Sequence, residues 1–100
     1  MTVRHHPARE HADVIDAGTQ LIDVRQPDEV ATGTIPGAVN IPLDQLPARI
    51  DELDRTRRVV LLCRSGRRSD HAAELLVAAG FGDVVNLDGG VLGCDPQTLT

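Results

Sequence analysis

The chain has 100 residues, a formal net charge of −5, 41% hydrophobic residues and one aromatic side chain, Phe81. We expect a single domain over residues 1–100, because this length supports one core but not two. The sequence has no apolar run of the roughly 18 residues that a membrane span requires, and its negative charge argues against general binding of nucleic acid. No hydrophobic segment typical of a secretory signal precedes Asp16, so we expect a cytoplasmic protein.

The two cysteines, Cys63 and Cys94, do not form a CxxC pair, and two are too few for a disulfide framework. His5, His6 and His11 lie close together in the sequence. However, no cysteine or histidine spacing resembles that of a zinc site. We therefore expect neither a metal nor another cofactor.

The start of the chain predicts a short edge strand at residues 2–4. A helix is expected to begin near Pro7, which suits a first helical turn, and to end at Gly18.

Residues 20–25 are nearly all apolar, as in a strand that is covered on both faces. Asp23 and Arg25 interrupt the run at its carboxyl end, where α/β sheets build their sites. Two roles are open for Asp23: a carboxylate that fixes a loop near such a site, or a structural partner for Arg25. We favour the second, because buried charges usually occur in pairs.

The remaining pattern alternates between helices and strands. In chain order it predicts a short helix over 27–33, a strand over 38–41, a helix over 44–53, a strand over 59–62, a helix over 69–79 and a strand over 84–87. Asp44 is the candidate N-cap of the second of these helices. The strand over 59–62 is fully apolar and is expected at the centre of the sheet. Alternating strands and helices imply an α/β fold with a parallel sheet.

The loop after residue 62 carries the chemistry. It reads Cys63-Arg64-Ser65-Gly66-Arg67-Arg68 and leads into a helix. A helix N-terminus, successive backbone N–H groups and nearby guanidinium groups each favour a thiolate over a thiol. No histidine lies nearby in the sequence to act as a base, but a cysteine with a lowered pKa needs none. The expected substrate is an anion with an electrophilic atom, such as sulfane sulfur or phosphorus.

A simpler interpretation makes Cys63 a small buried hydrophobe at the end of a core strand. The arginine-rich loop directly after it argues against this. The spacing then separates two chemistries. Cysteine-dependent phosphatases carry Cys-x5-Arg, whereas Cys63 to Arg68 is Cys-x4-Arg, a shorter loop that suits one added sulfur better than a phosphoryl group.

Five pieces of the sequence, taken in order, form a specific pattern. They are Leu-Ile-Asp-Val-Arg at 21–25, Gly-Thr-Ile-Pro-Gly-Ala-Val-Asn-Ile-Pro at 33–42, Cys-Arg-Ser-Gly-Arg-Arg-Ser at 63–69, Ala-Gly-Phe at 79–81 and Val-Val-Asn-Leu-Asp-Gly-Gly at 84–90. Over about residues 19–92 the chain resembles a single-domain rhodanese, a sulfurtransferase. The resemblance implies a parallel five-stranded sheet flanked by helices on both faces, with the cysteine loop above the sheet.

The resemblance also implies a double displacement with Cys63 as the catalytic residue. Its thiolate attacks the outer sulfur of a donor anion such as thiosulfate, and loop residues hold the resulting persulfide: Arg64, Ser65, Gly66, Arg67 and Arg68. An acceptor then takes the sulfur, either cyanide, a small thiol or a protein thiol. Arg64 and Arg68 are the expected contacts to the donor. Ser69 either donates to the persulfide or caps the helix.

Two positions depart from the family pattern. Thr34 stands where the family commonly has histidine, which removes a hydrogen-bonding or packing group from that turn. The aromatic residue usual after the double glycine is absent, and Cys94 lies near its place. We interpret Cys94 as an incidental thiol rather than a resolving partner for Cys63, since nothing around it lowers its pKa.

Three other functions stay open. The chain could be a non-catalytic regulatory or binding module, although such modules usually lose the cysteine or the arginines that are kept here. A phosphatase-like or arsenate-reducing enzyme is disfavoured by the loop length. A redox sensor would pair Cys63 with Cys94. We expect small-molecule partners, neither nucleic acid nor membrane, and a monomer, because aromatic residues that favour interfaces are nearly missing.

Overall fold

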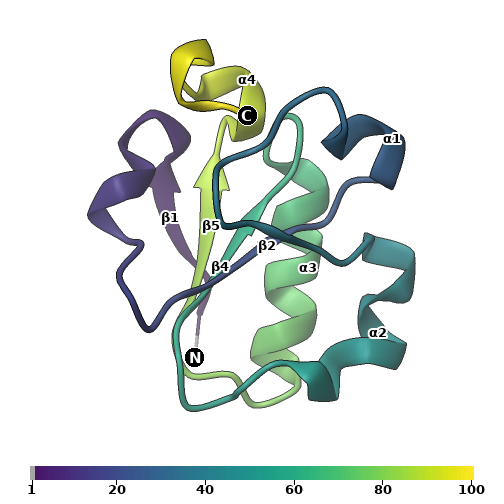
Figure 1. The fold of residues 1–100 in the computed structure, drawn as a ribbon. Helices are drawn as coiled ribbons and strands as arrows, with labels where there is room; N and C mark the ends of the chain where they lie inside the picture. Colours follow the sequence, from purple (N-terminus) through teal and green to yellow (C-terminus); the bar gives the residue numbers. More distant parts are fainter. Residues whose placement is uncertain (1) are drawn as a thin grey trace.

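The computed structural model describes residues 2–100, so Met1, the first residue of the expected domain, lies outside it. Within this part the chain forms a sheet of five strands in the order β1-β5-β4-β2-β3, and neighbouring strands pair in parallel (Figure 1). The strands are β1 Arg4–Pro7, β2 Gln20–Asp23, β3 Val39–Asn40, β4 Val59–Leu62 and β5 Val84–Asp88.

Helices cover both faces of the sheet, which confirms the predicted α/β class. The α-helices are α1 Pro27–Val30, α2 Leu46–Arg49, α3 Arg67–Ala78 and α4 Gly90–Gly93, and the 3₁₀ turns are Ala8–Asp13, Leu43–Gln45, Ile50–Glu52 and Pro96–Thr98. α2 and α3 pack against one face, whereas the first 3₁₀ turn and α4 pack against the other (Figure 1). Within residues 2–100, each helix is too short or too polar to cross a membrane.

β4 lies at the centre of the sheet, as its apolar sequence predicts. Val59, Leu61 and Cys63 belong to the core beneath α2 and α3, whereas Val60 and Leu62 belong to the core on the opposite face. Successive strand residues point to opposite faces, so a strand that is covered on both sides must be apolar throughout. Each fully buried aliphatic side chain of this kind contributes about 1.5–3 kcal/mol.

The first strand begins later than the sequence predicts. The pattern places it at residues 2–4, whereas β1 runs Arg4–Pro7 and pairs with β5. Pro7 therefore ends a strand instead of opening an α-helix, and proline is tolerated there because an edge strand leaves some backbone groups unpaired. The helix predicted to end at Gly18 is a 3₁₀ turn that ends at Asp13.

The predicted N-cap at Asp44 is wrong. The carbonyl of Pro42 already accepts hydrogen bonds from the backbone N–H groups of Gln45 and Leu46, at 2.9 and 3.1 Å. The helical turn therefore begins one residue earlier than predicted and places Asp44 inside it. The Asp44 carboxylate accepts a hydrogen bond from Gln26 at 3.1 Å instead.

α4 fastens the end of the chain to the cysteine loop. The backbone N–H of Val91 donates to the carbonyl of Cys63 at 2.9 Å, and that of Leu92 donates to the carbonyl of Arg64 at 3.0 Å. This contact requires glycine at position 90, where φ is +57°. A Cβ on Gly90 would collide with the Cys63 carbonyl and lie 2.6 Å from the carbonyl carbon of Arg64.

We expect Gly90→Ala to lower the free energy of unfolding by about 2–5 kcal/mol, because it combines an unfavourable left-handed backbone with overpacking. Gly37→Ala isolates the backbone effect, since Gly37 has φ +90° but open space around the added Cβ, and should cost about 1–2 kcal/mol. Gly82→Ala has neither problem and serves as the control. Chemical denaturation measures all three, and equal losses for Gly90→Ala and Gly37→Ala would show that the close contact is absent.

Candidate functional site

Cys63 lies directly after β4, at the carboxyl end of the central strand, and α3 begins at Arg67. The residue is 1% exposed. Its thiol is therefore surrounded by protein groups, and the polarity of these groups decides its chemistry.

Two groups donate hydrogen bonds to the sulfur. The backbone N–H of Gly66 lies 3.0 Å from Cys63 Sγ, and the hydroxyl of Ser69 lies 3.2 Å from it. Gly66 reaches the sulfur with φ +102°, a conformation that favours glycine. A Cβ on Gly66 would also lie only 3.1 Å from the nitrogen of Gly89. The structure thus places Gly66, one of the predicted loop residues, against the sulfur together with Ser69.

The pKa of the Cys63 thiol lies below its ordinary value. Burial is the largest single influence and raises the pKa, but hydrogen bonds outweigh it: the Ser69 hydroxyl and the backbone N–H groups of Ser69, Gly66 and Ser65 all lower it. The direction agrees with the predicted thiolate. The cause differs from the prediction in part, because hydrogen-bond donors rather than arginine side chains produce the shift.

The three loop arginines differ in their contacts. Two guanidinium nitrogens of Arg68 lie 2.8 and 2.7 Å from the two carboxylate oxygens of Glu29 in α1. This hydrogen-bonded pair lowers the pKa of Glu29 to about 2. Arg64 and Arg67 are exposed. Arg68 is therefore partly neutralised, whereas the charges of Arg64 and Arg67 face solvent.

The predicted structural pair of Asp23 and Arg25 is confirmed. Both residues are buried, and Arg25 Nη2 lies 2.7 Å from Asp23 Oδ2. Arg25 also donates to the carbonyl of Gly33 at 2.8 Å, and the Thr34 hydroxyl donates to Asp23 Oδ2 at 2.8 Å. Thr34 therefore supplies a hydrogen bond of its own in the turn where the family commonly has histidine.

Cys94 lies in the core on the face of the sheet opposite Cys63. Its Sγ contacts the carbonyl oxygen of Ala8 at 3.5 Å, and burial raises the pKa of its thiol. Neither cysteine forms a disulfide within residues 2–100. These observations support an incidental thiol over a resolving one.

The three clustered histidines do not share a site. His6 groups with Glu10 and Asp13, and their ligand atoms lie within 4.8 Å of one another. His11 bonds to a backbone carbonyl of its own turn at 2.8 Å, and His5 points towards β5. Successive strand residues point to opposite faces, which separates His5 from His6.

The structure adds two residues that the sequence does not indicate, Glu29 and Asn86, and it decides between the two predicted roles of Ser69. From the sequence alone, Ser69 could either cap the helix or donate to the sulfur. In the structure Gly66 occupies the N-cap position, and the Ser69 hydroxyl donates a hydrogen bond to Cys63 Sγ. The place of Ser69 in the first helical turn after the cysteine was a usable signal, because the unpaired donors of a helix lie at its N-terminus. Glu29 and Asn86 lie 39 and 20 positions from their loop partners, so no local pattern indicates them.

Acid should remove the contribution of the pair between Glu29 and Arg68. The pKa of Glu29 falls from 4.5 to about 2, so its contribution is complete above 4.5 and disappears as the pH falls towards 2. We expect Glu29→Gln to lower the free energy of unfolding by about 1 kcal/mol at neutral pH and the difference from wild type to vanish near pH 2. Urea unfolding across this range measures it. Glu52→Gln, in an exposed pair with Arg49, is the control, and a difference for Glu29→Gln that does not depend on pH would contradict the assignment.

Comparisons with known proteins agree with this geometry. The sequence profile of the rhodanese-like domain family matches residues 7–94, a wider region than the 19–92 of the resemblance. A sulfurtransferase of Allochromatium vinosum is 44% identical over 72 residues, which cover 72% of this chain and 67% of that protein. The thiosulfate sulfurtransferase GlpE of Stutzerimonas stutzeri is 36% identical over 84% of this chain and 76% of that protein.

Solved structures lead to the same family. The crystal structure of a rhodanese-like domain protein from Staphylococcus aureus superimposes with a TM-score of 0.87 and 29% identity, covering 98% of this chain and 97% of that one. The predicted resemblance is confirmed, and the chain belongs to the rhodanese-like domain family.

Proposed function

We propose that the protein is a sulfurtransferase that carries sulfane sulfur as a persulfide on Cys63. The observation that carries this proposal is the pair of hydrogen bonds to Cys63 Sγ from the N–H of Gly66 and the hydroxyl of Ser69, at 3.0 and 3.2 Å. Donors that are already in place stabilise negative charge without the cost of reorganising water. They suit a thiolate before the reaction and a persulfide after it. The names of the relatives, sulfurtransferase and thiosulfate sulfurtransferase, support the same class.

The proposed reaction has two displacements. The Cys63 thiolate attacks the outer sulfur of a donor such as thiosulfate; a bond forms between the two sulfurs, the sulfur–sulfur bond of the donor breaks, and sulfite leaves with its electron pair. In the second step cyanide or a thiolate attacks the terminal sulfur of the persulfide. The persulfide bond breaks, the acceptor keeps the sulfur, and the Cys63 thiolate is regenerated.

We assign the anionic end of the donor to the loop arginines. Arg64 offers an exposed guanidinium group next to the catalytic residue. Arg68 is also proposed as a contact, but a donor that binds it has to share it with the carboxylate of Glu29. Arg64 is therefore the stronger candidate. The backbone of Ser65, Gly66 and Arg67 completes the proposed cradle around the transferred sulfur.

The acceptor is proposed to be cyanide, a small thiol or the thiol of another protein. Each is a soft nucleophile that attacks sulfane sulfur, and each leaves Cys63 in its starting state.

Incubation with thiosulfate should add the mass of one sulfur atom to the intact protein, because the persulfide stays on Cys63 until an acceptor arrives. Cys63→Ser should abolish this gain. Cys94→Ser should keep it, since Cys94 lies in the other core. Intact-protein mass spectrometry under non-reducing conditions measures all three.

Two results would favour the alternatives. Wild-type protein that gains no sulfur from any sulfane donor would indicate a non-catalytic module. Turnover of an aryl phosphate that disappears in Cys63→Ser would indicate a phosphatase-like enzyme.

Arg64→Gln should raise the KM for thiosulfate about fivefold, because one charged hydrogen bond is worth about 1 kcal/mol or more. Arg57→Gln removes the same charge outside the loop, where its guanidinium donates to the carbonyl of Gly18, and should leave KM nearly unchanged. Glu29→Gln should lower KM, because it releases Arg68. Steady-state thiocyanate formation measures these values, and equal effects of Arg64→Gln and Arg57→Gln would show that only net charge matters.

A further inference from the structure

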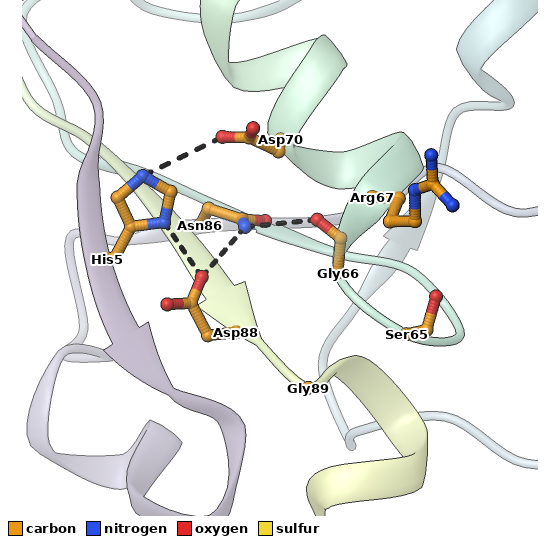
Figure 2. A pocket seen from close by; sticks show the side chains of 8 residues that line it. All are labelled: His5, Ser65, Gly66, Arg67, Asp70, Asn86, Asp88 and Gly89. Carbon is orange, nitrogen blue, oxygen red and sulfur yellow. Dashed lines mark hydrogen bonds and ion pairs between the residues drawn. The ribbon is translucent and has the colours of Figure 1, made fainter.

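Asn86 connects β5 to the cysteine loop from within the core. It is 2% exposed. Its Nδ2 donates to the carbonyl of Gly66 at 3.1 Å and to Asp88 Oδ1 at 3.0 Å. Figure 2 shows the side chain between these two partners, at a pocket of about 440 Å³ beside the loop.

Gly66 is the residue through which Asn86 can affect the sulfur. Its N–H donates to Cys63 Sγ at 3.0 Å, while its carbonyl accepts from Asn86. The two peptide groups flank a single left-handed residue with φ +102°. Holding the carbonyl therefore limits the directions in which the N–H can point. The same carbonyl also accepts the first backbone hydrogen bond of α3, from the N–H of Asp70 at 3.2 Å. It therefore accepts two hydrogen bonds, one from the helix and one from Asn86.

The amide oxygen of Asn86 makes no contribution that would explain an asparagine here, which leaves the N–H donor as the functional group. Asn86 Oδ1 is buried and has no hydrogen-bond partner among residues 2–100. An unpaired buried acceptor costs stability, which an apolar residue of similar size would avoid. What the amide adds over such a residue is the N–H group that reaches Gly66.

Asp88 decides which end of the amide faces Gly66. Asp88 Oδ1 accepts from Asn86 Nδ2 and also lies 2.7 Å from His5 Nδ1. Because a carboxylate only accepts hydrogen bonds, it turns the amide nitrogen of Asn86 towards itself and towards Gly66. Figure 2 shows His5 between Asp88 and Asp70. Asp88 and His5 are both about half exposed.

We propose that Asn86, oriented by Asp88, is a positioning residue that holds the Gly66 peptide so that its N–H points at the sulfur of Cys63. This deepens the proposed function, on which its catalytic consequence rests. Asn86 does not touch the sulfur; it acts through Gly66.

The thiolate absorbance of Cys63 tests this without any sulfur donor. The absorbance is followed in the ultraviolet as the pH is raised, and the signal of Cys63→Ser is subtracted. In Asn86→Leu the apparent pKa of the Cys63 thiol should rise by about one unit. At a pH below both values, this means about tenfold less thiolate. Asp88→Ala should shift the pKa in the same direction, by less. Asp88→Asn keeps an oxygen that accepts from the Asn86 amide, so the pKa of the Cys63 thiol in this variant should stay close to that of wild type.

Asn40→Leu is the matched control. Asn40 ends β3, and its amide donates to the carbonyls of Asp23 and Arg25 at 2.9 and 2.8 Å. Its loss should lower thermal stability without moving the pKa of Cys63. An equal pKa shift in Asn40→Leu would overturn the proposal, because the loss of any buried or half-buried asparagine of the sheet would then suffice. A folded Asn86→Leu with the wild-type pKa would also overturn it.

Asp88→Ala decides the matter if Asn86→Leu does not fold, because Asp88 is half exposed and outside the core. An unchanged pKa in that variant counts against the proposal. The sulfur-transfer assay is separate. A wild-type protein that takes up no sulfur refutes the proposed function, whereas the pKa series still shows whether Asn86 positions Gly66.

Discussion

The hydrogen bond from the Gly66 N–H to Cys63 Sγ is the constraint on which the site depends. It needs a left-handed residue at position 66, and it needs Cys63 at a strand end that faces the start of a helix. Cys63 directly follows β4 and α3 begins at Arg67, which meets the second condition. The close approach of Gly90 to the Cys63 carbonyl then holds the loop from the other side. Gly66, Gly90 and the apolar strand β4 thus together fix the position of the Cys63 sulfur.

Two ion pairs, Asp23 with Arg25 and Glu29 with Arg68, stabilise the segments that lie around this loop. The buried pair of Asp23 and Arg25 binds the turn at Gly33, and Arg25 also donates to the carbonyl of Glu29 at 3.3 Å. Removing one partner of such a pair costs about 3–5 kcal/mol, because the other charge stays buried. Glu29 in turn holds Arg68. The positive charge of Arg68, near the thiol, is therefore partly neutralised by a residue that lies far from it in the sequence.

The sequence predicts the parts of the fold that depend on local pattern. The apolar strands, the helix that follows the cysteine and the cysteine loop itself all follow from neighbouring residues. The partner of Arg68 could not be predicted in this way, because ion pairs are chosen by tertiary packing. The donor role of Ser69 was visible but competed with helix capping, a role that Gly66 fills. The start of β1 was misplaced, because a short polar edge strand has little apolar pattern to mark it.

The order of the strands also bears on when the contacts of the cysteine loop are completed. β1 pairs with β5, and His5 and Asp88 meet although they lie 83 positions apart. β4 lacks one neighbour until β5 is in place. Contacts of such long sequence separation form slowly, since the intervening chain must first be ordered. Asn86 lies on β5 and donates to the Gly66 carbonyl, so this contact of the cysteine loop forms only after residue 86 has been made and β5 has paired with β4.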